Sequence, residues 1–171
     1  PATLAQQAFA SAVYGAHPYG ADTTEATLAR ISTPDMRQRY AQWVRACRAQ
    51  VTVVGAVNRA QADTLVTDLL AHLPSTDCPV LPPVAEVAPL DKAVEQRIAF
   101  DSAQAHVLIG QPGIRREDPD YFALTVGNYI LGGGGFVSRL THEVREKRGL
   151  TYSVFSYFSP ARHAGSFTVC S

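Results

Sequence analysis

The pattern of apolar and polar positions in the first 73 residues predicts several short helices and one strand. Apolar side chains recur every three or four residues on either side of the turn residues 17–20, as in helices with one buried face. The β-branched run 51–57 is instead typical of a buried strand. The apolar faces comprise Leu4, Ala8, Phe9 and Ala12, then Met36, Tyr40, Trp43 and Val44, then Ala62, Leu65, Val66, Leu69 and Leu70.

Polar residues mark where three of these helices begin. Thr23 or Thr24 is expected to cap a short helix that runs through residue 31. Thr33 is the expected N-cap of a helix to about residue 47, with Pro34 in its first helical position. Asn58 is expected to cap the next helix.

The second half of the chain begins with a proline-rich stretch and continues as strands and helices. Five prolines between residues 74 and 89 predict an extended linker and the best domain boundary, over residues 74–92. Strands are expected at 94–100, 105–110, 152–158 and 165–170, the last two as antiparallel neighbours. Helical segments are expected from residue 118 and over 136–147. This mixture predicts an α+β fold in which helices pack on a mostly antiparallel sheet.

Composition narrows the function classes. The 171 residues carry 15 Lys and Arg against 15 Asp and Glu, so no basic excess indicates a nucleic-acid or anionic-membrane partner. No apolar run is long enough to form a membrane segment. The chain opens without an initiator Met or a signal peptide, and we expect a trimmed piece of a longer protein. Three widely spaced cysteines predict free thiols rather than a disulfide framework.

Residue spacing does not favour a metal site or a nucleophilic triad in this chain. None of the five histidines lies four or five positions from another, so no helix face offers two imidazoles to one ion. His142 and Glu143 are adjacent and are expected to lie on a solvated helix face. G-x-S-x-G is absent, and the glycine run at 132–135 lacks the spacing of a nucleotide-binding loop.

The most specific stretch is LGGGGFVSRLTHEVREKRGLTYSV, residues 131–154. It resembles the glycine-rich loop and Arg/Tyr motif of the pitrilysin/insulinase family, zinc peptidases with an inverted H-x-x-E-H that are related to mitochondrial processing peptidase. Residues 104–112 and 118–132 are similar to the segments that precede this loop. The resemblance implies the LuxS/processing-peptidase-like metallohydrolase fold. It divides the chain into the C-terminal part of a first family domain (1–73), the linker (74–92) and the N-terminal part of a second, zinc-free domain (93–171).

The resemblance also implies roles for individual residues. In this family one domain binds zinc and another supplies an arginine and a tyrosine seven positions apart, which Arg145 and Tyr152 match. Arg145 would hold a substrate carbonyl with its planar donors, and the Tyr152 hydroxyl would stabilise the negative oxygen of the transition state. The substrate backbone is expected to approach Gly132, Gly133, Gly134 and Gly135 closely.

The implied function is the zinc-free, substrate-positioning portion of a zinc-dependent metalloendopeptidase, inactive alone because H-x-x-E-H is absent. Zinc would be held by another domain of the parent chain, working as a homodimer, or by a separate subunit, and this piece would bind none. The peptide substrate stays open, and so does the compartment, for which the resemblance allows the bacterial periplasm. The alternatives are a structural core subunit of a protein complex with the same fold and a free-standing peptide-binding module.

Overall fold

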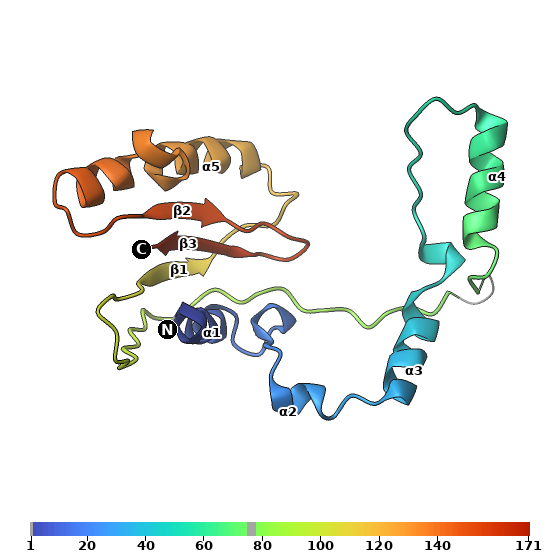
Figure 1. The fold of residues 1–171 in the computed structure, drawn as a ribbon, viewed down its shortest axis with the longest axis horizontal. Coiled ribbons are helices and arrows are strands. Elements are labelled where there is room, and N and C mark those ends of the chain that lie inside the picture. Colours follow the sequence, from blue (N-terminus) through green and yellow to red (C-terminus); the bar gives the residue numbers. More distant parts are fainter. Residues whose placement is uncertain (1, 75–77) are drawn as a thin grey trace. The chain divides into compact units, whose positions relative to one another are not determined.

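A computed structural model describes residues 2–74 and 78–171 and divides the chain into two compact units (Figure 1). The sheet unit comprises residues 2–22 and 84–171, and the helical unit comprises the described residues of 23–83. Part of the predicted linker, residues 75–77, lies outside the described residues. The division into family domains at residues 74–92 stays a prediction.

The sheet unit contains a three-stranded antiparallel sheet in the order β1-β3-β2. Its strands are β1 (Leu108–Pro112), β2 (Phe155–Phe158) and β3 (Ser166–Cys170). Val169 of the central strand lies opposite Ile109 on one side and Ser156 on the other. Together with the helices beside it, this sheet confirms the predicted α+β class and the antiparallel pairing of the last two strands.

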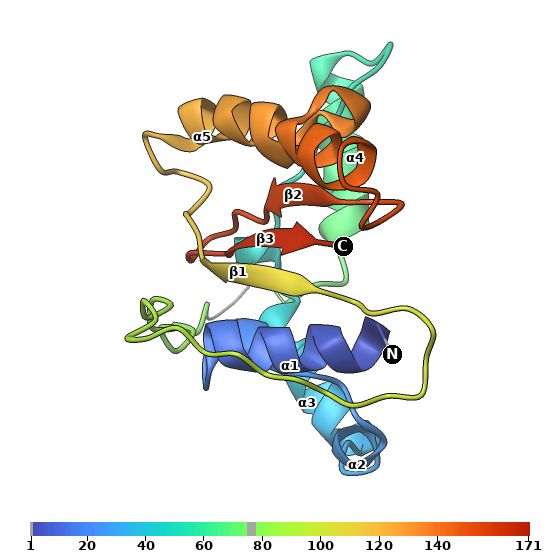
Figure 2. The same ribbon diagram turned by 90° about the vertical axis from the view of Figure 1, so that its left-hand side faces the viewer.

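Helices lie at both edges of this sheet. Helix α1 (Ala2–Tyr14) lies beside β1, and α5 (Tyr121–Asn128) lies beside β2 (Figures 1 and 2). Two hydrogen bonds join the end of α5 to β2, because Asn128 Nδ2 donates to the Ser156 carbonyl at 3.1 Å and Ser156 Oγ donates to Asn128 Oδ1 at 2.7 Å. Ser156 is buried, so each of these polar groups finds its partner inside the protein.

The turn after α1 and the segment 84–87 both form polar contacts with the loop between β2 and β3. His163 donates its backbone N–H to the Tyr19 hydroxyl at 3.2 Å, and the ring centroids of His17 and His163 lie 5.5 Å apart. Glu86 accepts hydrogen bonds from the backbone N–H groups of Ala164 and Val87. These two bonds, that of Ala164 most strongly, hold the pKa of the Glu86 carboxyl below its usual range. This carboxylate therefore fixes the 84–87 segment to the loop between β2 and β3.

The helical unit contains α2 (Glu25–Leu28), α3 (Thr33–Trp43) and α4 (Arg59–Leu70). Thr24 caps α2 and Asn58 caps α4, as predicted. The prediction of Thr33 as a cap is wrong, because Ser32 is the N-cap of α3 and forms a capping box with Asp35. Helix α3 also ends at Trp43 rather than near residue 47, and Pro34 occupies its second position.

Two predicted strands do not form within the described residues. Segments 51–57 and 94–100 contain strand-forming residues, but neither pairs with another described segment. A strand is stabilised by hydrogen bonds to a neighbouring strand, so local propensity alone does not produce it. The remaining elements are shorter or shifted: β1 begins at Leu108 instead of 105, α5 at Tyr121 instead of 118, and β2 at Phe155 instead of 152.

A disulfide joins Cys47 to Cys78 in the helical unit, with the Cα atoms 6.2 Å apart. The prediction of free thiols is therefore wrong for this pair and holds for Cys170. The bond closes a loop that contains all of α4, and the Ala46 N–H donates to the Pro74 carbonyl at 3.1 Å nearby. The two cysteines are 31 positions apart, and no local sequence pattern predicts that they form a disulfide.

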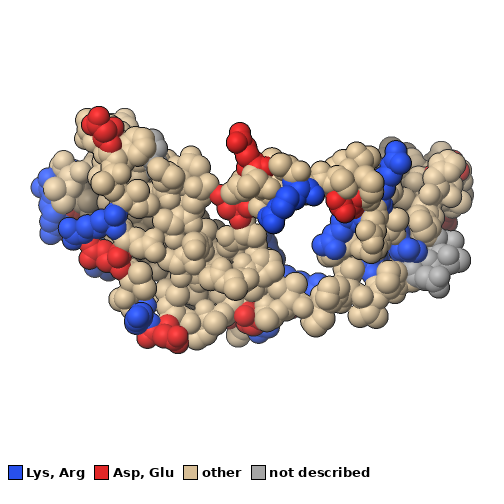
Figure 3. All heavy atoms as spheres, turned by 90° about the horizontal axis from the view of Figure 1, so that it is seen from below, with Lys and Arg blue, Asp and Glu red and all other residues tan. Residues whose placement is uncertain are grey.

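Few apolar side chains are buried among the described residues. The buried ones are Val13, Val87 and Val154, whereas many large apolar side chains are exposed. On the face drawn in Figure 3, acidic and basic residues lie in small groups among larger uncharged areas. Within residues 2–74 and 78–171, no helix combines the length and the hydropathy that a membrane span requires.

Candidate functional site

The glycine run follows α5 directly and lies against the sheet. The chain continues from α5 into a π-helical stretch, Tyr129–Gly133, which contacts β2. Gly132 is buried there, and a Cβ on it would lie 2.4 Å from Ser156 Oγ and 2.6 Å from the Ser156 nitrogen. A Cβ on Gly134 would lie 2.7 Å from the Tyr129 carbonyl oxygen. Both positions therefore require glycine for internal packing.

Two buried hydroxyls fix the loop after the glycines. Gly135 has a φ of 61°, in the left-handed region that favours glycine. Its carbonyl oxygen accepts hydrogen bonds from Ser138 Oγ at 2.7 Å and from Thr141 Oγ1 at 2.9 Å. Ser138 is 0% exposed and Thr141 is 5% exposed, so this network is shielded from water.

Arg145 and Tyr152 lie close together. Arg145 lies in a π-helical stretch, Thr141–Glu146, which is followed by a turn before Gly149. Gly149 has a φ of 60° and donates its N–H to the Arg145 carbonyl, so the chain reverses there, as glycine commonly does after a helix. This reversal brings the Tyr152 ring centroid to 5.0 Å from Arg145 Cζ, within the range of a cation–π contact.

The acidic side chains next to Arg145 are engaged by other cations. Glu143 accepts hydrogen bonds from Lys147 Nζ at 2.6 Å and from Arg148 Nη1 at 3.0 Å, which hold its pKa below the usual range. Glu146 Oε2 lies 2.9 Å from His142 Nδ1. Among the described residues, Arg145 forms neither an ion pair nor a side-chain hydrogen bond. The N–H donors of its guanidinium are therefore not engaged by side chains of the described residues.

Sequence reasoning missed Phe136. Its ring centroid lies 4.8 Å from Arg145 Cζ, so the guanidinium contacts two aromatic rings, those of Phe136 and Tyr152. Both rings are exposed, at 72% and 87%. The signal in the sequence that could have indicated Phe136 as a site residue is its position immediately after the glycine run. Val137 and Leu150, which are near Phe136 and Tyr152 in the sequence, are also exposed.

The histidines and acidic side chains of the described residues are spread over separate contacts. No group of three or more His, Cys, Asp or Glu side chains in residues 2–74 and 78–171 is arranged to hold a metal. His142 and Glu143, the adjacent pair in the motif, take part in separate helix-surface contacts with Glu146 and with Lys147. The histidines at positions 17 and 163 face each other across 5.5 Å but belong to the contacts around Glu86.

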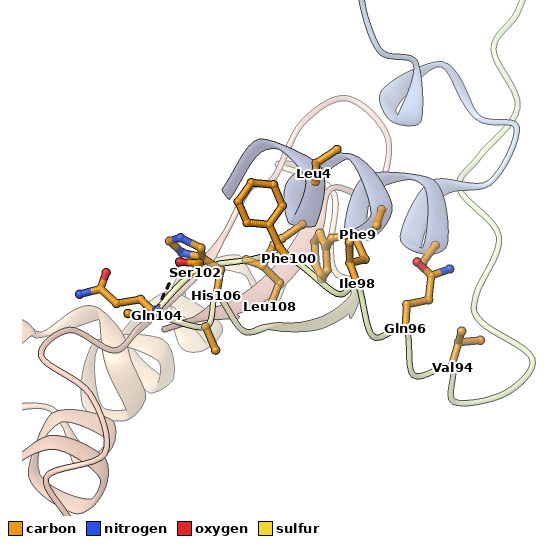
Figure 4. A pocket seen from close by; sticks show the side chains of 15 residues that line it. Leu4, Phe9, Val94, Gln96, Ile98, Phe100, Ser102, Gln104, His106 and Leu108 are labelled. Carbon is orange, nitrogen blue, oxygen red and sulfur yellow. Dashed lines mark hydrogen bonds between the residues drawn. The ribbon is translucent and has the colours of Figure 1, made fainter. Parts of the chain in front are cut away.

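A pocket lies apart from Arg145 and Tyr152 in the same unit. It has a volume of about 430 Å³ and lies between α1 and the segment 94–108 (Figure 4). Apolar side chains of α1 face apolar side chains at alternate positions of this segment. These are Leu4 and Phe9 on one side and Val94, Ile98 and Phe100 on the other. Neither Arg145 nor Tyr152 lines the pocket, and His106 is its only titratable side chain.

Comparison with known proteins gives one family. The family model described as "Peptidase M16 inactive domain" matches residues 30–171. A relative from Bacillus subtilis named "Uncharacterized zinc protease YmxG" is 28% identical over 99% of this chain. A relative from Helicobacter pylori named "Non-peptidase homolog YmxG" is 30% identical over 96% of it. The chain spans 40% and 37% of the lengths of these two relatives.

Solved structures give the same result. The crystal structure of a peptidase M16 inactive domain from Pseudomonas fluorescens matches with a TM-score of 0.91 and 37% identity, over 99% of this chain and 41% of that one. The crystal structure of a protease from Helicobacter pylori matches with a TM-score of 0.86 and 21% identity, so the two chains share a fold. The family resemblance inferred from residues 131–154 is thereby confirmed, and so is the fold that it implied.

Proposed function

Because this chain belongs to the peptidase M16 inactive-domain family, we propose that it is the zinc-free, substrate-positioning portion of a zinc-dependent metalloendopeptidase. The zinc belongs to another domain or subunit, which activates the attacking water. In this proposal the chain is inactive by itself, because residues 2–74 and 78–171 hold no group of metal ligands that could activate water.

The observation that carries this proposal is Arg145, a cation without an acidic partner among the described residues, beside an exposed Tyr152. An unpaired guanidinium can donate to a main-chain carbonyl of an extended peptide. A phenol hydroxyl near the scissile bond can donate to the oxygen that becomes negative in the transition state. The two residues therefore have different roles, in which Arg145 holds the peptide and Tyr152 lowers the barrier to its hydrolysis.

The glycine run contributes in two ways in this proposal. Gly133 and Gly135 are exposed, so a peptide backbone can approach them, although a Cβ on Gly133 would also lie 2.7 Å from Asn128 Nδ2. Gly132 is buried and Gly134 is half-buried, and a Cβ at either position would collide with other atoms of the chain, so they support the loop from within. Substrate contact at all four glycines, as the resemblance implies, would then be direct at two positions and indirect at two.

A zinc-bearing family domain is the proposed partner. Relatives are named zinc proteases, and the chain spans only part of their length. Phe136, Val137 and Leu150 are large apolar side chains that are exposed, and such side chains, where they adjoin, are commonly covered by another polypeptide. A peptide substrate and a zinc-bearing domain of the same or a second chain, in a homodimer or heterodimer, would together complete the site.

The test uses the full-length parent protein with Tyr152 replaced by Phe. Loss of one transition-state donor typically lowers turnover by about 10²- to 10³-fold, and zinc content should stay unchanged because Tyr152 does not bind the metal. Tyr157→Phe is the matched control, since Tyr157 lies in β2 and stacks on Phe155. Unaltered turnover in the Tyr152→Phe protein would refute the proposed role.

A non-enzymatic function is the second candidate. The Helicobacter pylori relative is named a non-peptidase homologue, so the family includes a protein described as lacking the activity. A structural core subunit would depend on the exposed apolar surface and would not need Arg145 or Tyr152. If substitution of both residues left complex assembly intact and no assembly hydrolysed peptides, the structural role would be favoured.

A further inference from the structure

Phe136 is the residue of the site whose position the glycine-run motif does not explain. It lies between the glycine run and Ser138, with 72% of its surface exposed. Exposed apolar side chains are common, so the informative observation is what this ring contacts. That contact is with Arg145, whose Cζ lies 4.8 Å from the ring centroid.

The backbone holds this ring in a defined place. Gly135 adopts a φ of 61° immediately before Phe136, and its carbonyl is held by the buried hydroxyls of Ser138 and Thr141. Both hydroxyls come from the segment that leads into Arg145. The Thr141 hydrogen bond therefore joins the loop carrying Phe136 to the helical stretch carrying Arg145, in addition to the contact of the two side chains.

An aromatic contact suits a cation that must bind a ligand. The faces of aromatic rings attract a guanidinium without using its N–H groups in conventional hydrogen bonds. A carboxylate partner would instead occupy those donors in pairs. Phe136 can therefore orient Arg145 while leaving its donors available, whereas Glu143 and Glu146 are engaged by Lys147, Arg148 and His142.

We propose that Phe136 is a positioning residue that holds the Arg145 guanidinium for the main-chain carbonyl of a peptide substrate. The role of Arg145 in this statement rests on the proposed function, while the contact itself does not. Because Arg145 holds the peptide both before and during the reaction, loss of Phe136 should weaken substrate binding and leave the chemical step unchanged.

The experiment compares three variants of the full-length, zinc-loaded protein. Phe136→Leu removes the ring, Phe136→Trp keeps an aromatic face, and Phe122→Leu is the control. Phe122 is also exposed, at 78%, but lies in α5 against Tyr121. For Phe136→Leu, we expect KM for an extended peptide to rise about two- to fivefold with kcat unchanged, the size of an exposed cation–π contact. Phe136→Trp should restore KM, and Phe122→Leu should match the parent.

A second measurement is independent of activity. The Nε–Hε resonance of Arg145, assigned with an Arg145→Lys protein, is shifted by the ring currents of nearby aromatic rings. In Phe136→Leu this resonance should move toward the position of an arginine without aromatic neighbours, and in Phe136→Trp it should stay displaced. An Arg145 resonance that Phe136→Leu leaves in place would overturn the positioning role. A shifted resonance with unchanged KM would confirm the contact and refute the proposed use of Arg145 on substrate.

Discussion

Replacing Gly132 with alanine tests how the glycine run is mounted on the sheet. The new Cβ would lie 2.4 Å from Ser156 Oγ, 2.6 Å from the Ser156 nitrogen and 2.7 Å from Leu140 Cδ1. The Ser156 backbone lies in β2, opposite Val169 of β3, so it has little room to retreat. The collision should cost about 1–3 kcal/mol, the range for overpacking a filled site. Displacing Ser156 Oγ from Asn128 would add about 1 kcal/mol.

Gly127→Ala is the matched control for this change. Gly127 lies within α5, and a Cβ there meets nothing within 4 Å. Alanine is the better helix former, so this variant should be about 0.5–1 kcal/mol more stable than the parent. Urea unfolding followed by far-UV circular dichroism gives both free energies of unfolding, provided that the denaturant slope is unchanged. A Gly132→Ala protein as stable as the parent would refute the packing described for the glycine run.

Two further predictions concern the ties within each unit. Cys47→Ser should lower the free energy of unfolding of the helical unit by up to about 3.7 kcal/mol, the loop-closure value for a separation of 31 residues. Denaturant unfolding followed by the fluorescence of Trp43, the only tryptophan, measures this free energy. Three thiols that react in the oxidised parent would contradict the disulfide itself. Glu86 has a lowered pKa in the folded state, so its stabilisation is present above the usual glutamate pKa and is lost as the pH falls through the lowered value. In Glu86→Gln this loss should be absent, so the free energy of unfolding should fall less steeply between about pH 6 and about pH 3 than in the parent. An unchanged dependence on pH would show that Glu86 does not contribute to it.

The sequence predicted best those elements that depend on local interactions. The Asn58 side chain caps α4 by accepting a hydrogen bond from the Gln61 N–H, three residues away, so the cap is determined locally and was predicted correctly. At α3 two adjacent hydroxyl residues could serve as the cap, and Asp35, three residues after Ser32, completes the capping box there. Residues 51–57 have strand propensity, but a strand depends on a distant partner that propensity does not specify.

The candidate site was predictable only in part for the same reason. The spacing of Arg145 and Tyr152 is a property of the motif, and the turn at Gly149 places them together. The contact of Phe136 with Arg145 depends on backbone geometry at Gly135 and on two buried hydroxyls, which the linear pattern does not encode. The Cys47–Cys78 bond likewise requires a fold that brings distant residues within reach.

The most direct test of the central claim is to purify this 171-residue chain alone and measure its bound zinc and its peptide hydrolysis with and without a chelator. Because the metal and the activated water are proposed to belong to another domain or subunit, we expect no stoichiometric zinc and no chelator-sensitive hydrolysis. Zinc bound at about one ion per chain, together with hydrolysis that a chelator abolishes, would show that this chain carries a catalytic zinc site of its own.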